Sequence, residues 1–512
     1  MQAIGHSKEA GKNVPLISPS HWARMAMLGL LVTLSASALS APDAGPAVTP
    51  PDESVSTDPP LAVAETFVLD NGLQVVVIPR RDSESVLHMV WYKTGAADDP
   101  PGQSGLAHFV EHLTFGSMEV GSDYPDFHKL ERQAVQLEAY TSYDQTVYYQ
   151  DVSLEALPLA MSVEARRMRD LDLTPEAMAS ERREIRQERS DEQFEDERDQ
   201  HQKLHSALYP GHPYSRSVLG GVQELAGVTA EDAKAYHRQW YAPNNAVLIM
   251  TGPVRAQSLR PLIQQHYGDI PARPLADRRQ ATAISPKPGL SATRLYQHWS
   301  ETLWIREYLA PSYVTGPTEH TAALQVLAAL LGGDPDSRLH RRIVGELGLA
   351  RDISVTYEPA SLGMTPLTIE VTLSSREDVA RVVETIDLEL NRIRLEGPFE
   401  AELERAKRAL LAETVHSQQD RYAWAQWIGT ALTSGLEFEE LSAWPERISK
   451  VTQDDVRRSV NVLLPPHFRV TAVPDPGSGC RQPAECRLDN PDPDRSAIDI
   501  TTIADGAVQA PL

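Results

Sequence analysis

The chain has 512 residues, of which 41% are hydrophobic, and its formal net charge is −23. This length exceeds one ordinary domain, and the apolar content is sufficient for a sizeable core. The negative charge argues against nucleic acids and anionic membranes as partners. It is compatible with positively charged peptides as ligands, although solubility is the more ordinary explanation of such a charge.

The first 41 residues have the pattern of an export signal. Arg24 precedes an apolar run over 25–34, and small residues follow up to Ala41. A charged flank, a short apolar core and a cleavage region occur in this order in signal peptides. The run is too short to span a membrane stably, and the long stretch before it suggests that translation begins at Met25. We therefore interpret 1–41 as a signal peptide and 42–62 as a Pro-rich linker. The mature protein is expected to be periplasmic or secreted in a bacterium, without stable membrane insertion.

Residues 66–78 alternate between apolar and polar side chains, which predicts strands, and a helical segment follows. At about 100° per residue, His108, Glu111 and His112 share one face of that helix. The opposite face is an apolar stripe formed by Leu106, Phe109, Val110 and Leu113. Such a helix packs on a core and presents polar groups to a cavity. Ser104 is the expected N-cap, and Gly116 is the expected end of the helix.

The three polar residues form the pattern H-x-x-E-H. Two imidazoles at i and i+4 can share one metal ion, and Glu111 is placed to take a proton from water at that metal. Spacing alone also fits a chance match on a solvated helix face. However, this order reverses the commoner H-E-x-x-H and is the inverzincin signature, which indicates a zinc peptidase.

A second helical segment, 176–201, is highly charged. Its acids Glu181, Glu184 and Glu188 share one face, and its arginines lie on the other. Glu184 and Glu188 are like charges at i,i+4, which costs a few tenths of a kcal/mol, roughly, unless a cation neutralises them. A zinc site with two histidines commonly takes a carboxylate as its third ligand. We expect one of these acids to be that ligand, although a solvated helix with internal salt bridges also fits the pattern.

The rest of the chain suggests two similar halves. Residues 157–171 and 321–331 have helical periodicity, and 367–373 alternate like a strand. The segment 272–291 clusters Pro and Arg without periodicity and reads as a linker. We expect an α+β fold in which 63–271 and 292–475 form two domains, each a mixed, mainly antiparallel sheet with helices on one face. In the polar tail 476–512, Cys480 and Cys486 could close a local disulfide rather than bind a metal.

Together these motifs resemble the pitrilysin family of metallopeptidases, which includes the mitochondrial processing peptidases and the insulin-degrading enzymes. The resemblance covers about 63–475. Flanking segments follow the family's order: Leu69-Asp70-Asn71-Gly72-Leu73, Gly95, Gly105-Leu106-Ala107-His108, Thr141-Ser142-x-Asp144-x-Thr146 and Tyr241-x-Pro243-Asn244-Asn245.

The resemblance implies a set of roles for the residues of the two helices. His108, His112 and Glu188 would bind one Zn²⁺ per chain, and Glu111 would be the general base. Glu181 would support the site from outside the ligand set. The family also implies that the two domains are homologous. The first would hold the metal for catalysis, and the second would shape half of a chamber.

Substrate contacts are less clearly matched. An extended peptide is expected to add to an exposed strand edge, and Ala139, Tyr140 and Thr141 match the family's edge strand. Glu138 stands where the family usually has Asn. In the second half, many members grip the substrate backbone with an Arg and a Tyr. Val344 and Arg351 occupy those positions here.

This departure bears on the partners. Either neighbouring arginines substitute, or a paralogous subunit carrying the Arg/Tyr pair completes the chamber as a heterodimer, with a homodimer as the next alternative. The function that the resemblance implies is a zinc-dependent endopeptidase that hydrolyses peptides or unfolded segments in an enclosed chamber. The alternative is a non-catalytic or weakly active chamber subunit of a heteromeric peptidase. Inactive relatives typically lose a ligand or the base, whereas this chain keeps all four residues.

Overall fold

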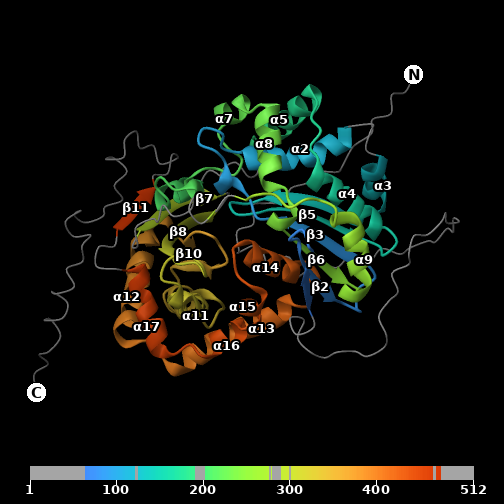
Figure 1. Ribbon diagram of the computed structural model, residues 1–512. Helices are drawn as coiled ribbons and strands as arrows, with labels where there is room; N and C mark the ends of the chain where they lie inside the picture. Colours follow the sequence, from blue (N-terminus) through green and yellow to red (C-terminus); the bar gives the residue numbers. More distant parts are fainter. Residues whose placement is uncertain are drawn as a thin grey trace, which may run out of the picture.

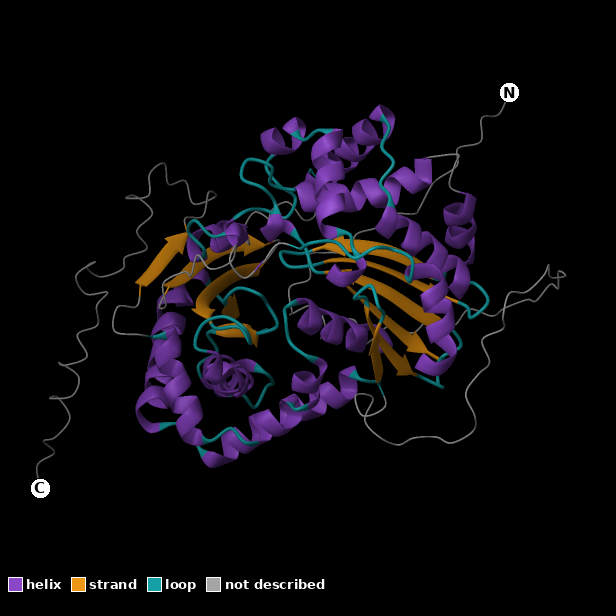
Figure 2. Ribbon diagram, viewed as in Figure 1, coloured by secondary structure: helices purple, strands orange, loops and turns teal. Residues whose placement is uncertain are grey.

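The computed structural model describes residues 64–120, 125–190, 202–275, 278, 290–298, 301–464 and 469–473. Two β-sheets with separate sets of helices make up this part of the chain (Figures 1 and 2). The predicted α+β class, with two halves of mixed sheet and packed helices, is confirmed. The signal peptide, the linker 42–62, most of 272–291 and both cysteines lie outside the described residues. The domain boundaries stay a prediction.

The first sheet has the strand order β1-β2-β6-β3-β5-β4. Its neighbouring strands are antiparallel except for β2 and β6, which run parallel. The strand bounds are β1 Glu65–Val68, β2 Gln74–Pro79, β3 Val86–Tyr92, β4 Gln136–Thr141, β5 Thr146–Val152 and β6 Ala246–Gly252. The predicted run 66–78 thus contains most of two strands and a turn. Because β4 ends the sheet, one of its edges pairs with no strand in the described part of the chain.

Helices of the first half cover one face of this sheet (Figure 2). Their bounds are α2 Leu106–Val120, α3 Pro125–Gln133, α4 Leu157–Arg169, α5 Pro175–Arg189, α7 Val222–Gly227, α8 Ala230–Trp240 and α9 Ala256–Tyr267. Helices α2 and α5, which carry the two charged motifs, lie side by side. Inward side chains of α2, α4, α8 and α9 share one apolar core with the sheet.

The second sheet has the strand order β11-β7-β8-β10-β9 and contains one parallel pair, β11 and β7. Its strands are β7 Leu290–His298, β8 Glu301–Ala310, β9 Ala350–Tyr357, β10 Thr365–Leu373 and β11 Arg469–Val473. The helices of this half are α11 Thr321–Gly332, α12 Val379–Glu396, α13 Glu400–Ser417, α14 Arg421–Thr433, α15 Phe438–Ser442, α16 Trp444–Ser449 and α17 Gln453–Leu463. Strand β10 alternates between buried and half-buried positions, as the periodicity predicts.

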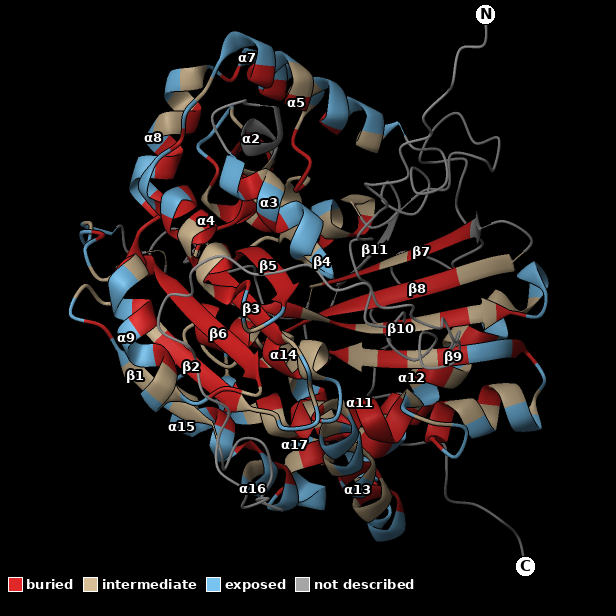
Figure 3. Cartoon of the chain, turned by 90° about the vertical axis from the view of Figure 1, so that its right-hand side faces the viewer, coloured by how far each residue is buried: buried red, intermediate tan, exposed pale blue. Residues whose placement is uncertain are grey.

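The expectation that each sheet carries helices on one face only is wrong for the first sheet, because α14 covers its second face. Although α14 follows the second sheet in sequence, it packs on β3 and β6 of the first sheet (Figure 1). Trp424 and Ile428 of α14 share an apolar core with Met89 and Trp91 of β3. With both faces covered, every residue of β3 and β6 is buried (Figure 3). Strands buried on both faces read as continuous apolar runs rather than alternating ones.

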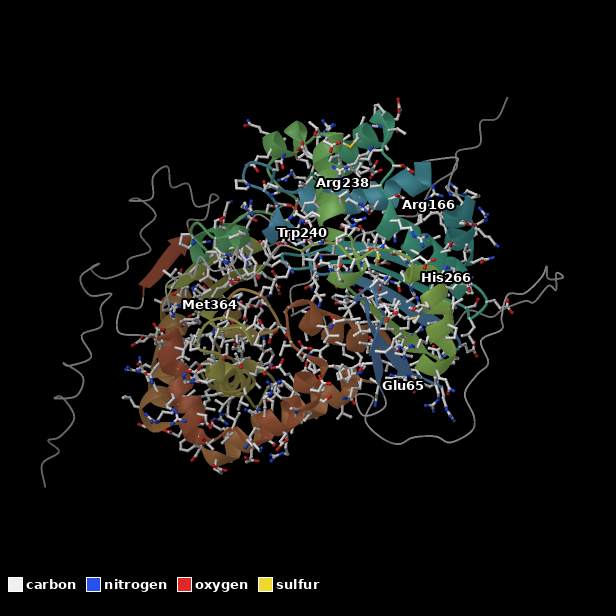
Figure 4. The ribbon with its side chains drawn as sticks, viewed as in Figure 1. Glu65, Arg166, Arg238, Trp240, His266 and Met364 are labelled. Carbon is white, nitrogen blue, oxygen red and sulfur yellow. The ribbon has the colours of Figure 1, made fainter. Side chains whose placement is uncertain are left out.

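Hydrogen bonds also join the two halves. Tyr214 Oη donates to the carboxylate of Asp144, 2.7 and 2.6 Å from its two oxygens, and the backbone N–H of Leu362 donates to the same carboxylate at 3.0 Å. Tyr209 Oη donates to the carbonyl of Met364 at 3.0 Å; Met364 is labelled in Figure 4. The first half is therefore fixed to the turn that precedes β10. Among the described residues, no helix is long and apolar enough to span a membrane.

Candidate metal centre

The start of α2 is built by contacts distant in sequence. Gly105 has a positive φ of 86°, and a Cβ there would meet the backbone of Gly220 at 2.8 Å. A side chain at Gly105 would therefore be strained and would push the helix away from this loop. The carboxylate of Asp99 accepts the N–H groups of Gly105 and Ala107 at 2.7 and 2.8 Å. These bonds satisfy donors that a helix N-terminus leaves unpaired.

Two expected helix boundaries are wrong. The hydroxyl of Ser104 accepts the N–H of Gly221 rather than capping its own helix, because Asp99 takes that role. Helix α2 continues through Gly116 to Val120. A glycine inside a helix costs about 1 kcal/mol relative to alanine, which the packing of α2 outweighs. The apolar stripe is as expected, since Leu106, Phe109, Val110 and Leu113 are buried.

The structure brings His108 and His112 of α2 together with Glu188 of α5. Glu188 Oε2 lies 3.7 Å from His108 Nε2 and 3.6 Å from His112 Nε2. One ligand atom from each residue lies within 4.8 Å of the others, and no other such cluster is found in the described ranges. Glu184 is exposed on the outer side of α5. The geometry therefore selects Glu188 from the two acids that the sequence left open.

Glu181 and Glu111 flank this cluster. Glu181 Oε2 lies 3.3 Å from His112 Nδ1, so the carboxylate contacts the ring nitrogen that points away from Glu188. Such carboxylate–histidine pairs fix the orientation of metal-binding rings. The Oε2 atom of Glu111 lies 3.9 Å from His108 Nε2, beside the cluster. His108 Nδ1 is buried and has no hydrogen-bond partner among the described residues.

Burial gives these groups unusual proton affinities. Burial and the neighbouring His112 lower the pKa of His108 to about 3, so that its ring is neutral. Burial alone would lower the pKa of His112, but its contacts with Glu181 and Glu188 outweigh this and raise the pKa to about 10. Burial raises the pKa of Glu111 to about 7. The cluster thus binds a proton tightly where two histidine nitrogens and a carboxylate converge.

These residues fit a zinc ion. Tetrahedral zinc with nitrogen and oxygen ligands holds its donor atoms about 3.4 Å apart. The separations of 3.6 and 3.7 Å from Glu188 Oε2 to the two Nε2 atoms are close to that value and too long for hydrogen bonds. A cation at the same point would replace the proton on His112, since metal ligands must be deprotonated. Two histidines and one carboxylate are a common ligand set of catalytic zinc.

The edge strand β4 turns its two faces toward different helices. Ala139 packs in the core shared with α2, and Thr141 Oγ1 donates a hydrogen bond to Glu111 Oε2 at 2.9 Å. The side chain of Tyr140 points to the opposite face, where its ring meets Trp91 edge-on. Glu138 lies on that same opposite face and accepts a hydrogen bond from Tyr149. The predicted peptide contacts of this strand, and the roles of the metal-site residues, stay predictions.

Val344 and Arg351 occupy the second-half positions that depart from the family, and neither belongs to the metal-site cluster. Val344 lies in a single π-helical turn, η6 His340–Glu346, and packs against the second core. Arg351, on β9, has a side chain that is 62% exposed and lies 3.8 Å from Glu301. Two residues that shape the site were missed by the sequence analysis, namely Asp99 and Gly220. Asp99 is visible as an acid shortly before the helix, whereas the contact of Gly220 leaves no local signal.

Family comparisons agree with this arrangement. The family model for insulinase, peptidase family M16, matches residues 75–221, and the model for the M16 inactive domain matches residues 227–410. An uncharacterized zinc protease of Mycobacterium tuberculosis is 27% identical over 438 residues, covering 84% of this chain and 98% of its own length. A probable mitochondrial-processing peptidase subunit beta of Schizosaccharomyces pombe is 25% identical over 418 residues, covering 79% and 89%.

Solved structures share the fold. A protease from Helicobacter pylori superposes with a TM-score of 0.69 at 21% identity, covering 80% of this chain and 98% of that one. The first half of the periplasmic protease PqqL from Escherichia coli gives a TM-score of 0.68 at 20% identity, covering 91% and 100%. Against the whole of PqqL, the match spans 52% of that protein. The chain is similar to zinc proteases along most of its length and belongs to the M16, or pitrilysin-like, family of metallopeptidases.

Proposed function

We propose that the chain is a zinc-dependent endopeptidase that hydrolyses peptides or unfolded polypeptide segments. The observation that carries this proposal is the convergence of His108, His112 and Glu188 beside the carboxylate of Glu111. If these three residues held a zinc ion, they would leave room at the metal for water or substrate. When bound, zinc would act as a Lewis acid that polarises the scissile carbonyl and makes water more acidic.

The protein's own groups complete the reaction. Glu111 takes a proton from the attacking water and passes it to the leaving amine, so that one water is added across one peptide bond. Glu181 holds the ring of His112, and its loss would weaken metal binding about tenfold to a hundredfold. The free edge of β4 would receive the peptide as an added strand, with Ala139, Tyr140 and Thr141 nearest to it. Main-chain hydrogen bonds of this kind bind extended segments with little dependence on sequence.

A second subunit is part of the proposal. Val344 is a partly buried apolar residue that packs against the second core, and Arg351 faces Glu301 at the surface, so neither supplies the Arg/Tyr grip described for the family. The chain superposes on the first half of PqqL, and its match with the whole of PqqL spans 52% of that protein. A paralogous subunit that carries the pair would orient the substrate, and a homodimer is the alternative. Misplacement of a substrate by about 1 Å can cost about two orders of magnitude in rate.

We infer that the protein acts in the periplasm or outside a bacterial cell, because the sequence of 1–41 resembles an export signal. The natural protein should therefore be isolated from the exported fraction, together with any partner that copurifies. Cleavage of unfolded casein is then measured with and without a chelator, and again after addition of Zn²⁺.

The alternative functions predict different results in this experiment. The proposal predicts cleavage that chelation abolishes and one equivalent of zinc per chain restores. Cleavage by the complex but not by the separated chain, at equal zinc content, would support the partner. A complex that binds zinc without cleaving any peptide would favour the non-catalytic chamber subunit. Full activity from a demonstrably monomeric chain would contradict the need for a partner.

A further inference from the structure

We infer that Thr141 is a positioning residue that fixes the carboxylate of Glu111 through its hydroxyl group. The inference rests on the proposed function, because it concerns how the base of that reaction is held. Thr141 Oγ1 donates to Glu111 Oε2 at 2.9 Å, and both side chains are buried. The oxygen that Thr141 holds is also the one that lies 3.9 Å from His108 Nε2. The hydroxyl therefore acts on the side of Glu111 that borders the cluster.

The position of this hydroxyl is fixed by its strand. Thr141 is the last residue of β4 and pairs with Thr146 of β5. The turn that follows is held to the segment just after β3, because the N–H groups of Ala96 and Ala97 donate to the carbonyls of Ser142 and Tyr143, both at 2.9 Å. A β-branched side chain on such a backbone has few rotamers. Glu111, by contrast, has three side-chain torsions, and its carboxylate makes no other hydrogen bond to the described residues, so it depends on Thr141 for its orientation.

A second hydroxyl lets Thr141 serve both forms of Glu111. Thr146 Oγ1 lies 3.3 Å from Thr141 Oγ1 and donates to the carbonyl of Thr94 at 3.1 Å. While Glu111 is ionised, Thr141 donates to it. When Glu111 holds the proton taken from water, Thr141 can accept from Glu111 and turn its own hydrogen toward Thr146. The hydroxyl thus keeps a partner throughout the transfer, and the carboxylate stays in place.

Thr141 also lies on the strand that would bind the substrate. The edge of β4 is where the proposed peptide would add, and Thr141 is the end of that edge. The residue that orients the base therefore belongs to the strand that would orient the substrate. An effect on the base should appear in kcat, because the transition state needs the aligned carboxylate whereas peptide binding does not.

The test compares Thr141→Val, which removes the hydroxyl and keeps the shape, with Thr141→Ser, which keeps the hydroxyl. Thr251→Val is the matched control. Thr251 is buried in β6 of the same sheet, and its hydroxyl has no hydrogen-bond partner among the residues that the structure describes. Turnover of one internally quenched peptide is measured for the full chain with any copurifying partner. Zinc content is measured for each variant.

Thr141→Val should lower kcat by about tenfold or more while KM and zinc content stay within about twofold. Thr141→Ser should recover most of the loss, and Thr251→Val should not change kcat. In a Glu111→Gln background, Thr141→Val should have no further effect, since the base is already lost. Equal losses in both backgrounds, or failure of the Ser variant to recover, would mean a merely structural role and would overturn the inference.

A second readout needs no activity. In crystals of metal-free Thr141→Val, the Glu111 carboxylate should leave its position or occupy more than one rotamer, and Thr141→Ser should restore a single one. An unchanged single position would overturn the inference. The two proposals fail differently. Unimpaired turnover by Glu111→Gln contradicts the proposed function, whereas a loss with Glu111→Gln but none with Thr141→Val contradicts only the role of Thr141.

Discussion

The two halves of the molecule use a similar strand plan to hold very different helices. In the first half, β3 leads into α2, which buries His108 and Glu111. In the second half, β8 leads into α11, whose sequence TAALQVLAALLG contains no His, Asp or Glu and is buried along most of its length. Burying imidazoles and carboxylates together is costly unless they are paired or bind a metal. The apolar helix stabilises its half, whereas the polar one provides a site.

The described strands of the two sheets differ in where the last strand of each half lies. In the first sheet the last strand, β6, lies between β2 and β3, whereas in the second sheet β11 lies outside β7 and leaves β7 paired with β8. The central β6 is covered on both faces, in part by α14 from the second half (Figure 3). The half with the polar helix is thus the more completely enclosed. A rigid, doubly covered sheet is a suitable support for a site that requires exact geometry.

The largest effect should come from replacing Glu188, the proposed carboxylate ligand in the first half. Glu188→Gln should lose zinc affinity by at least about a hundredfold and reduce hydrolysis to background, because a neutral amide is a poor substitute for the carboxylate ligand. Glu184→Gln is the matched control on the same helix, and it should retain zinc, since Glu184 is exposed. Zinc titration with a competing chelator measures both. Loss of zinc from the Glu184 variant with retention in the Glu188 variant would reverse the assignment.

Loss of the proposed base should reduce hydrolysis without loss of zinc. Glu111→Gln should keep zinc, because no proposed ligand is lost, yet reduce peptide hydrolysis by at least about a hundredfold. The measurement is turnover per bound zinc, with wild-type and Glu188→Gln proteins as the two limits. Near-normal turnover would leave the metal as the source of catalysis and remove the role of Glu111.

Part of the candidate site in the first half could be predicted from the sequence. The H-x-x-E-H pattern is local, so helical periodicity alone puts its side chains on one face. The proposed third ligand, Glu188, lies 76 positions after His112, and periodicity could only narrow the choice to Glu184 or Glu188. Distinguishing Glu188 from Glu184 required either the packing of α5 on α2 or the family resemblance. The bond from Thr141 to Glu111 depends on where β4 lies relative to α2, which no short pattern encodes.

The fold was predicted at the level of class and halves, but not in its cross-connections. The cover of the first sheet by α14 joins segments more than 170 residues apart. A signal did exist, because β6 begins with a run of apolar residues and β3 is apolar apart from His88, and such nearly continuous apolar runs indicate burial on both faces. Gly116 misled the prediction of the helix end, since local propensity yields to tertiary packing.

The second half also contains a buried acid, and its effect should be on stability. Burial raises the pKa of Glu307 on β8 to about 8 from its ordinary 4.5. The folded chain then keeps a proton that the unfolded chain releases, so this contribution to stability is complete below about pH 4.5 and is lost as the pH rises toward about 8. The Tm of the unmodified protein should therefore fall between pH 5 and pH 8. We expect this fall to be about 5 °C smaller in Glu307→Gln. Thermal unfolding of both proteins at matched ionic strength is the test. Parallel pH profiles would mean that Glu307 is ionised in the folded protein.

The smallest effect should come from the link between the halves. Tyr214→Phe removes the hydroxyl that donates to Asp144 and accepts the N–H of Gly363. We expect a loss of about 2 kcal/mol in unfolding free energy, because hydrogen bonds to a buried carboxylate are stronger than neutral ones. Zinc affinity should not change, since Tyr214 does not contact the metal-site cluster. Urea unfolding checks the first statement and zinc titration the second. A variant with normal stability would show that the apolar contacts alone hold the halves together.

We propose that the metal chemistry belongs to the first half; the described residues of the second half form no comparable cluster. Anomalous X-ray scattering at the zinc edge, from crystals of the chain with stoichiometric Zn²⁺, tests it most directly. The account predicts one strong peak bounded by His108, His112 and Glu188, and no peak of similar height in the second half. A peak ligated by Glu184, a full-occupancy site in the second half, or an empty cluster with both histidines ordered would contradict it.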